Sequence, residues 1–298
     1  MPRVIGAIVL WLAGTTCLFA QTGSTPAGVP VSMIVTVESP SSLPMPDISR
    51  QDVMVHQGHT RAKVTGWEPF AGDRAGLELF VLLDDSPDIS RGTQLEDLRN
   101  FILAQPATTK IGVAYMQIGS PQIAQPVTTD HALAAKAVRV SLSELASSVS
   151  PYFSLSELIK NWPTGAARRE VLMVSNGIDY QWEGTMAGKD NPYVNSAIEQ
   201  AQRAGIVILT VSTSNAGHYL SQIADETGGR AYNQGFGSAV SIAPYLSDSA
   251  QRLSRQFLLT FLAKAEKKGG MQAVKINTEV PHAKLVSADK VYVPAVGQ

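Results

Sequence analysis

Two kinds of hydrophobic pattern divide this chain into a middle part and two ends. In the middle part, short unbroken apolar runs alternate with segments whose apolar residues recur at helical spacing. Unbroken runs bounded by turn residues predict strands buried on both faces, and the helical spacing predicts amphipathic helices. We expect strands at Leu77–Leu83, Lys110–Ile118, Gln122–Val127, Glu170–Ser175 and Ile206–Ser212. We expect helices at Gln94–Ala104, Ala132–Leu145, Leu155–Trp162, Tyr193–Ala204, Tyr219–Thr227 and Ser238–Leu253.

Strand and helix in repeated succession predict an α/β fold with a Rossmann-like, doubly wound, mostly parallel sheet. Local signals at two helix starts agree with this division. Asp130 stands at the N-cap position of one predicted helix, and Asn191 with Pro192 stands at the start of another. Asp and Asn side chains accept hydrogen bonds from the first turn of a helix, and Pro suits its first position.

Both ends of the chain carry short segments in which apolar and polar residues alternate, which is typical of half-buried strands. These segments are Val31–Val37, Asp52–His56, Arg61–Phe70, Gln256–Ala263, Met271–Val280 and Val291–Val293. Small isolated sheets are marginally stable in water. We therefore expect 256–263 and 271–280 to form a hairpin that pairs with the N-terminal strands, so that both ends build one small β domain.

The N-terminal residues have the pattern of a secretory signal peptide. Arg3 is followed by the apolar run Val4–Leu12, then by small residues and then by LFA at 18–20, after which we expect cleavage. The run is shorter than the roughly twenty apolar residues that span a membrane, so we expect no membrane insertion after cleavage. The protein is then exported, either periplasmic or secreted. The single cysteine, Cys17, lies inside the signal peptide, and a lipid anchor there is the alternative.

Together these patterns predict the order of domains along the chain. We expect a signal peptide at 1–20, a flexible lead-in at 21–30, an N-terminal β segment at 31–70, an α/β domain at 76–254 and a C-terminal β segment at 255–298 that pairs with 31–70.

Composition narrows the class of protein. With 298 residues, 44% of them hydrophobic and 16% charged, the chain can bury a sizeable core. A formal net charge of −1 gives no general attraction to nucleic acid or to anionic membrane surfaces. Among the histidines only His56 and His59 lie close together, and we interpret them as surface residues of a hairpin turn rather than metal ligands.

Candidate chemistry gathers where the first predicted central strand stops. Its apolar run ends at the acidic pair Asp84 and Asp85, which the turn residues Ser86–Asp88 follow. In open α/β sheets, ligands lie outside the carboxyl ends of the strands. We therefore expect the binding site of this protein near Asp84.

At these strand ends the sequence resembles a von Willebrand factor type A domain. The resemblance rests on the strand ending in DDSPD at 84–88, the strand ending in SNG at 175–177, the strand Ile206–Ser212 and the run IADETGGRAY at 223–232. Order and spacing match across roughly 77–253. The flanks VTVESP and DISRQDVMVHQG near the start, with LSRQFLLTFLA and VKINTEV near the end, resemble those of secreted bacterial proteins of the acidobacterial von Willebrand A-related group.

The resemblance implies a metal-ion-dependent adhesion site, in which Mg²⁺ completes its coordination with an acidic group of a protein partner. The family motif is Asp-x-Ser-x-Ser after the first strand, a Thr from a second loop and an Asp after a later strand. Asp84 and Ser86 fit the motif, whereas Asp88 replaces a Ser and Asn176 replaces the Asp. These are the candidate metal ligands.

In the second loop, around 150–156, Phe153 falls nearest to the expected Thr, with Ser154 beside it. Mg²⁺ requires oxygen ligands in near-octahedral order, and Asp88 is longer than the Ser that it replaces. We therefore expect a degenerate metal site and no bound cofactor. A magnesium site that functions despite the substitutions is the alternative.

We interpret the chain as an exported, non-catalytic protein-interaction module of the adhesion type. The ligand is a protein partner or a surface, and we expect contacts at Asp85, Phe153, Ser154 and Trp182, because these residues follow the relevant strands or lie in the second loop. Trp162 and Tyr180 are expected to lie at the same end of the sheet.

An enzyme is the second alternative, as a hydrolase that uses Asp84 or Asp88 as a catalytic carboxylate. The sequence has no nucleophile elbow, no phosphate-binding glycine loop, no zinc-protease helix motif and no cysteine outside the signal peptide. We therefore expect no enzyme activity.

Overall fold

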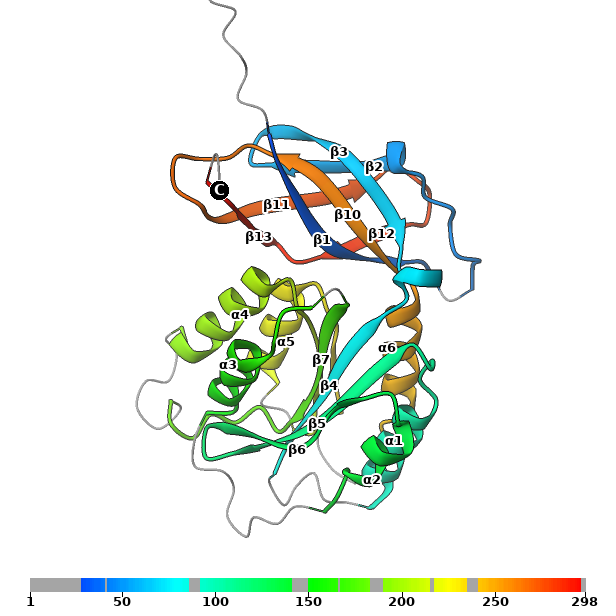
Figure 1. Cartoon of the computed structure of the whole chain (residues 1–298), viewed down its shortest axis with the longest axis vertical. Helices are drawn as coiled ribbons and strands as arrows, with labels where there is room; N and C mark the ends of the chain where they lie inside the picture. The colour runs from blue at the N-terminus through cyan, green and yellow to red at the C-terminus, as the bar shows by residue number, and fades with distance from the viewer. Residues whose placement is uncertain are drawn as a thin grey trace, which may run out of the picture.

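An α/β domain and a curled antiparallel β domain lie end to end in the molecule (Figure 1). The computed structural model describes residues 28–40, 42–85, 92–140, 150–165, 167–182, 190–214, 217–234 and 241–295. The predicted signal peptide lies outside these residues.

The α/β domain is built on a six-stranded sheet with the order β6-β5-β4-β7-β8-β9. Its strands are β4 (Leu77–Asp84), β5 (Thr109–Gln117), β6 (Ser120–Thr128), β7 (Arg168–Ser175), β8 (Val207–Ser212) and β9 (Ala231–Asn233). All neighbours pair in parallel except β6, which runs antiparallel to β5 at the edge. The chain leaves β4 for β5 on one side and later enters β7 on the other, so the topological switch point lies at the end of β4.

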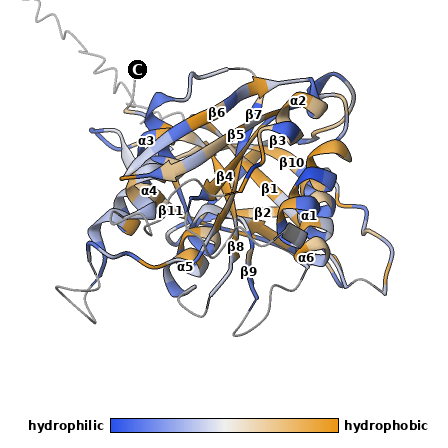
Figure 2. Ribbon diagram, turned by 90° about the horizontal axis from the view of Figure 1, so that it is seen from below, coloured by the Kyte–Doolittle hydropathy of each residue, from blue (hydrophilic) through white to orange (hydrophobic). Residues whose placement is uncertain are grey.

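Helices cover both faces of this sheet, and its strands are mostly hydrophobic (Figure 2). On one face lie α1 (Gly92–Leu103), α2 (His131–Lys136) and α6 (Ala243–Ser254), and on the other lie α3 (Pro151–Asn161), α4 (Pro192–Ala204) and α5 (His218–Thr227). Successive residues of β4 enter opposite cores, Leu79 on the α1 face and Phe80 on the α3 face. The predicted doubly wound fold is confirmed.

The predicted helix starts are confirmed, but one helix is shorter than predicted. The Asp130 side chain accepts a hydrogen bond from the Leu133 N–H at 3.0 Å, and the Asn191 side chain accepts one from the Tyr193 N–H at 2.9 Å. The prediction of a helix as far as Leu145 is wrong within the described residues, because α2 ends at Lys136. The following backbone turns instead toward the Tyr115 hydroxyl, which donates to the Ala137 carbonyl at 3.2 Å.

The β domain is a seven-stranded sheet with the order β12-β1-β10-β3-β2-β11-β13. Its strands are β1 (Val29–Glu38), β2 (Val53–Gln57), β3 (Thr60–Pro69), β10 (Gln256–Ala263), β11 (Gly270–Thr278), β12 (Lys284–Ser287) and β13 (Lys290–Val293). Strands from the two ends of the chain are interleaved in this sheet and share one core. The prediction of a β domain built from both ends is therefore confirmed.

The predicted C-terminal hairpin is wrong, because β10 and β11 do not pair with each other. β10 lies between β1 and β3, whereas β11 pairs with β2 and β13. The Gln57 side chain fixes this arrangement at the end of β2. Its amide donates to the Lys264 carbonyl at 2.9 Å and accepts from the Lys264 N–H at 2.7 Å, so the end of β10 lies beside the β2–β3 turn.

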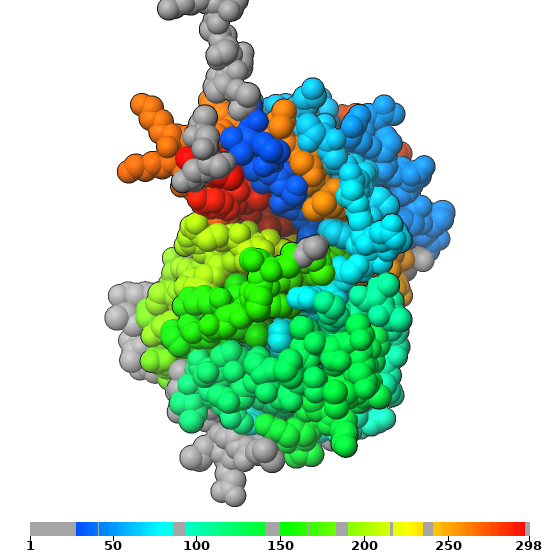
Figure 3. All heavy atoms as spheres, in the orientation of Figure 1, coloured from blue at the N-terminus to red at the C-terminus, as the bar shows by residue number. Residues whose placement is uncertain are grey.

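The two domains are in direct contact, as the space-filling view shows (Figure 3). The turn between β12 and β13 packs on the end of α5, where Gly228 has a φ of 80°. A Cβ atom at Gly228 would lie 2.5 Å from the backbone of Ser287 and Ala288, so only glycine fits both the turn and the contact. Among the described helices, none is long and apolar enough to cross a membrane.

Candidate functional site at the carboxyl edge of the sheet

The edge of the six-stranded sheet where β4, β5, β7 and β8 end is called the carboxyl edge here. It faces away from the β domain, which lies at the opposite, amino edge (Figure 1). Asp84 is the last residue of β4 and Asp85 follows it, and both are buried. Because successive side chains of a strand point to opposite faces, the two carboxylates enter different environments.

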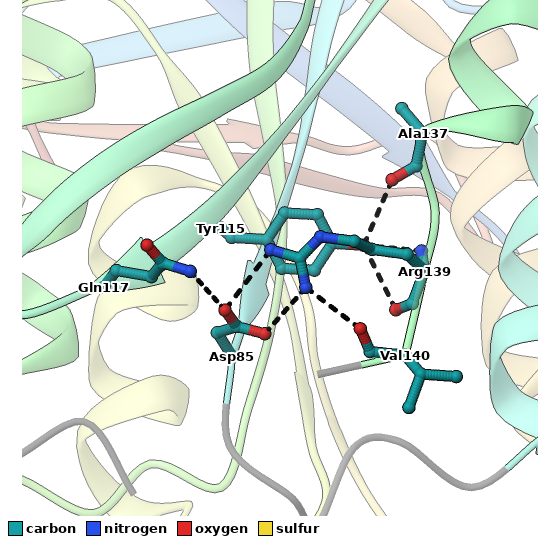
Figure 4. Close-up of polar contacts among 6 residues, drawn as sticks. All are labelled: Asp85, Tyr115, Gln117, Ala137, Arg139 and Val140. Atoms are coloured by element: carbon teal, nitrogen blue, oxygen red, sulfur yellow. Dashed lines mark hydrogen bonds and ion pairs between the residues drawn. The ribbon is translucent and has the colours of Figure 1, made fainter. Parts of the chain in front are cut away.

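Asp85 forms one cluster with Tyr115, Gln117 and Arg139, called the Asp85 cluster (Figure 4). The Arg139 guanidinium donates to Oδ1 of Asp85 at 3.1 Å and to Oδ2 at 3.3 Å, and the Gln117 side-chain amide also donates to Oδ2. The guanidinium carbon lies 3.9 Å from the centre of the Tyr115 ring, close enough for a cation–π contact. Asp85 is thereby neutralised within the protein.

The Tyr115 hydroxyl fixes the backbone that carries Arg139. It accepts a hydrogen bond from the Arg139 N–H at 2.7 Å and lies within donating distance of the Ala137 and Arg139 carbonyls. Burial raises the pKa of Tyr115, so this hydroxyl keeps its proton. The cluster therefore ties the segment after α2 to the ends of β4 and β5. Since the Asp85 side chain is 0% exposed, it cannot make the partner contact expected from the sequence.

Asp84 lies on the other side of β4, toward β7. The Ser175 hydroxyl donates to Oδ2 of Asp84 at 2.9 Å, and the same Ser175 oxygen accepts from the Gly177 N–H at 3.0 Å. The end of β4 and the loop after β7 are thus joined through Ser175.

Asn176 follows Ser175 and is 2% exposed. Its side-chain oxygen accepts from the Ile178 N–H at 3.0 Å, which fixes the orientation of the amide. Its side-chain nitrogen is buried and has no hydrogen-bond partner among the residues that the structure describes. The atom of Asn176 that is left without a partner is therefore a donor, which attracts an acceptor group and repels a cation.

Asp179 organises the loops on this side and was not singled out by sequence reasoning. Its carboxylate is fully buried and accepts from the Ser150 hydroxyl at 2.7 Å and from the Asn191 amide at 2.8 Å. It also accepts from the backbone N–H groups of Gln181 and Trp182 at 3.1 and 3.2 Å. One carboxylate thus joins the starts of α3 and α4 to the loop after β7.

The predicted second loop is the first turn of α3 in the structure. Phe153 is 41% exposed and its ring lies edge-on to Tyr193, whereas Ser154 is 1% exposed and cannot reach a partner's surface. Trp182 is half-buried. The placement of Trp162 at this edge is wrong, because Trp162 ends α3, packs on Phe80 and donates to Glu78 in the amino half of β4.

The described donor atoms do not fit a magnesium ion well. Asp84 supplies a carboxylate, but the side-chain oxygen of Asn176 is engaged with Ile178 and its remaining atom is a donor. The predicted ligands Ser86 and Asp88 lie outside the described residues. Within the part of the chain that the structure describes, no three His, Cys, Asp or Glu side chains gather as a metal site.

Exposed apolar side chains surround the buried polar groups of this edge. They are Ile118, Val140, Phe153 and Tyr180, with exposures of 78%, 56%, 41% and 47%, and are called the apolar rim. Ile118 follows Gln117 of the Asp85 cluster and has a φ of 47°, a conformation that strains a β-branched residue. Sequence reasoning placed Ile118 at the end of a buried strand and therefore missed it.

No family model matches the sequence, and no curated protein matches it either. Solved structures match at low identity. An aerotolerance-related membrane protein from Bacteroides fragilis is 13% identical with a TM-score of 0.44, and the match covers 60% of this chain and 98% of that chain. A von Willebrand factor type A protein from Catenulispora acidiphila is 9% identical with a TM-score of 0.44, covering 94% and 76%.

The von Willebrand domain of a type V pilus tip protein from Porphyromonas gingivalis is 12% identical with a TM-score of 0.44, covering 59% of this chain and 94% of that chain. Such matches say nothing about ligands. The strand order described above, with Asp84 and Asn176 at the ends of β4 and β7, gives the α/β domain the von Willebrand A fold that the sequence motifs resemble.

Proposed function

We propose that this protein is an exported, non-catalytic module that binds a protein partner at the carboxyl edge of its von Willebrand A domain, without a bound metal. The observation that carries the proposal is the apolar rim around the ends of β4, β5 and β7. Large apolar side chains that are exposed beside polar groups are typical of protein-binding surfaces.

The strained backbone of Ile118 supports the same conclusion. A β-branched residue at positive φ is unfavourable by about 1–2 kcal/mol relative to glycine, and this side chain is 78% exposed, so its burial does not offset the strain. The two-residue hairpin turn between Gln117 and Ser120 requires positive φ at both Ile118 and Gly119, which Gly or Asn adopts with less strain, so the turn does not explain an exposed Ile at this position. We therefore place the centre of the proposed contact surface at the tip of the β5–β6 hairpin.

The alternatives expected from the sequence receive less support from the described side chains. A functional magnesium site is favoured by the position of Asp84 at the topological switch point of the sheet. It is disfavoured because the side-chain oxygen of Asn176 already accepts a hydrogen bond from the Ile178 N–H. A hydrolase is disfavoured because Asp84 is largely buried and accepts a hydrogen bond from the Ser175 hydroxyl. Its rival carboxylate Asp88 lies outside the described residues.

Site-specific photo-cross-linking tests the proposal. A photoreactive amino acid replaces Ile118 in cells that export the protein, and Lys63, which is exposed on β3 of the β domain, is replaced as the control. We expect a discrete cross-linked protein from position 118 that is absent from position 63. Equal products from both positions, or none from position 118, would contradict a partner at the carboxyl edge.

Magnesium titration separates the proposal from its closest rival. We expect no heat of binding and no change in melting temperature when Mg²⁺ is added to millimolar concentration. A stabilisation by Mg²⁺ that disappears in Asp84→Ala would establish the metal site instead. Export is tested independently, because the mature protein from producing cells is expected to begin at Gln21.

A further inference from the structure

A second buried carboxylate lies at the amino edge of the sheet, where the two domains meet. Glu170 is in β7 and is 0% exposed. Its side chain lies on the same face of the sheet as Leu172 and Val174, the face covered by α6. Among the described residues neither oxygen of its carboxylate accepts a hydrogen bond of normal geometry, although the Gln256 side chain lies close enough to lower its pKa. A buried carboxylate without hydrogen bonds is strongly disfavoured in its charged form.

The cations beside Glu170 are bound to other groups. The nearest is Arg168, whose Nη1 lies 3.9 Å from Oε1 of Glu170. The same nitrogen donates to the Leu253 carbonyl at 2.8 Å and to the Gln256 side chain, and the guanidinium lies over the Phe70 ring. At 3.9 Å the ion pair is longer than a hydrogen bond, so it only partly compensates for burial.

Arg252 of α6 is the second cation near Glu170, and it is bound to Glu38 of β1 and to the Gly229 carbonyl. Glu38 also pairs with Lys284 and Arg230 at 3.6 and 3.9 Å. Glu38 is partly exposed and Arg252 and Lys284 hold its pKa below the ordinary value, although burial opposes them. The charge of Arg252 is thus directed to Glu38 rather than to Glu170.

Both chain connections between the domains pass over this point. The segment after β3 and the end of α6 lead from one domain to the other, and the Phe70 N–H donates to the Gln256 carbonyl at 3.0 Å. The Val37 N–H donates to the Arg255 carbonyl at 2.9 Å. These hydrogen bonds, with Arg168 and Glu170 beneath them, are called the domain junction. Hydration of Glu170 therefore requires the junction to open.

We propose that Glu170 is a proton-operated lock of the domain junction: in its neutral form it keeps the β domain docked on the α/β domain, and its ionisation loosens the contact. This device is independent of the binding function proposed for the carboxyl edge. It makes the attachment of the β domain sensitive to pH in the range between mildly acidic and mildly basic conditions.

The sign of the effect follows from burial. Burial raises the pKa of Glu170 from 4.5 to about 7, although Arg168, the Gln256 side chain and Arg252 lower it in part. A group with a raised pKa in the folded state contributes stability that is complete below 4.5 and is lost as the pH rises through 7. By the same linkage, the equilibrium constant for opening the junction rises about tenfold between pH 6 and pH 8.

Hydrogen exchange at the junction tests the proposal. We would measure the exchange of the Val37 and Phe70 amides of the wild-type protein and of Glu170→Gln at pH 6 and pH 8, corrected for the intrinsic rate. Protection is expected to fall about tenfold in the wild type and to stay constant in the variant. The amide of Val81, in the core of β4, serves as the internal reference.

Glu38→Gln is the matched control, since it removes a carboxylate at the same junction but leaves Glu170 in place. The fall in protection is expected to persist in this variant. A wild type without the fall, or Glu170→Gln with the same fall, would overturn the proposal. If Glu170→Gln does not fold, the carboxyl ¹³C titration of the wild type decides: a glutamate midpoint near 7 supports the lock, and midpoints confined to the ordinary range overturn it.

Discussion

Buried carboxylates differ in their hydrogen-bond donors between the two edges of the α/β sheet. At the carboxyl edge, Asp85 and Asp179 each receive several donors, from Arg139 and Gln117 in one case and from Ser150, Asn191 and backbone amides in the other. At the amino edge, Glu170 is fully buried and, among the described residues, accepts no hydrogen bond of normal geometry, with only the Gln256 side chain and the cations Arg168 and Arg252 near it. Donors that converge on a carboxylate make a rigid frame, whereas a buried carboxylate without them responds to pH.

The two edges also differ in the side chains that they expose to solvent. The carboxyl edge satisfies its acidic groups internally and exposes apolar side chains, Ile118 most of all. The amino edge carries the contact with the β domain (Figure 3). The proposed partner-binding surface and the contact between the domains thus lie at opposite ends of the strands of the α/β sheet. Binding at one edge and attachment at the other can be changed independently.

Removal of Asp179 should have the largest effect on stability. Asp179→Ala leaves the Ser150 and Asn191 donors buried without their acceptor, and such losses cost about 3–5 kcal/mol in unfolding free energy. Urea denaturation measures the change. Asp73→Ala, at an exposed position in the link between the domains, should leave the midpoint nearly unchanged. A small effect of Asp179→Ala would mean that the loops are not held by this carboxylate.

Neutralising Glu170 should raise the free energy of unfolding at basic pH, whereas removal of Asp179 lowers it. Glu170→Gln removes the need to bury a charge, so we expect it to raise the unfolding free energy by up to about 3 kcal/mol at pH 8 and by little at pH 4. Denaturation curves over this pH range show the difference. A variant that is less stable than the wild type at pH 8 would mean that the ionised carboxylate contributes favourable contacts.

Breaking the Asp85 cluster should cost less than removing Asp179, because Arg139 is partly exposed and regains water. We expect Asp85→Ala to lower the unfolding free energy by about 2 kcal/mol. Asp190→Ala, an exposed aspartate before α4, is the control that should change little. If both variants unfold alike, the ion pair with Arg139 is only a surface interaction.

Relieving the strain at Ile118 should give the smallest effect, and a stabilising one. Ile118→Gly suits the φ of 47°, and we expect a gain of about 1 kcal/mol in thermal or urea unfolding. The same variant should lose the cross-linkable contact at the carboxyl edge, if Ile118 is kept for binding. A loss of stability would show that the side chain serves the fold instead.

Much of the fold was predictable because its signals are local. Buried apolar runs gave the central strands, and Asp130 and Asn191 marked helix starts that the structure places within a residue or two. The strand pairing of the β domain was only partly predictable. Nothing near 256–280 reveals that the Gln57 side chain holds Lys264 and that the β2–β3 hairpin separates β10 from β11.

The candidate site was located by its position, but its interactions depend on residues far apart in sequence. Asp85 pairs with Arg139, which lies in a segment that looked like a continuation of a helix. Asp179 looked like an ordinary turn residue, and the positive φ of Ile118 leaves no trace in the residue type. Asp85 and Ser154 are excluded as contact residues because their side chains are buried. Burial of a single side chain depends on how the loops assemble, which the local sequence does not show.

Cross-linking from position 118 in the presence of a chelator tests the central claim most directly, because it asks at once where the partner binds and whether a metal is needed. With EDTA in the exported fraction, we expect the same cross-linked product from position 118 as with added Mg²⁺, and none from position 63. A product that disappears with EDTA and returns with Mg²⁺ would contradict the account and restore the metal-dependent adhesion site.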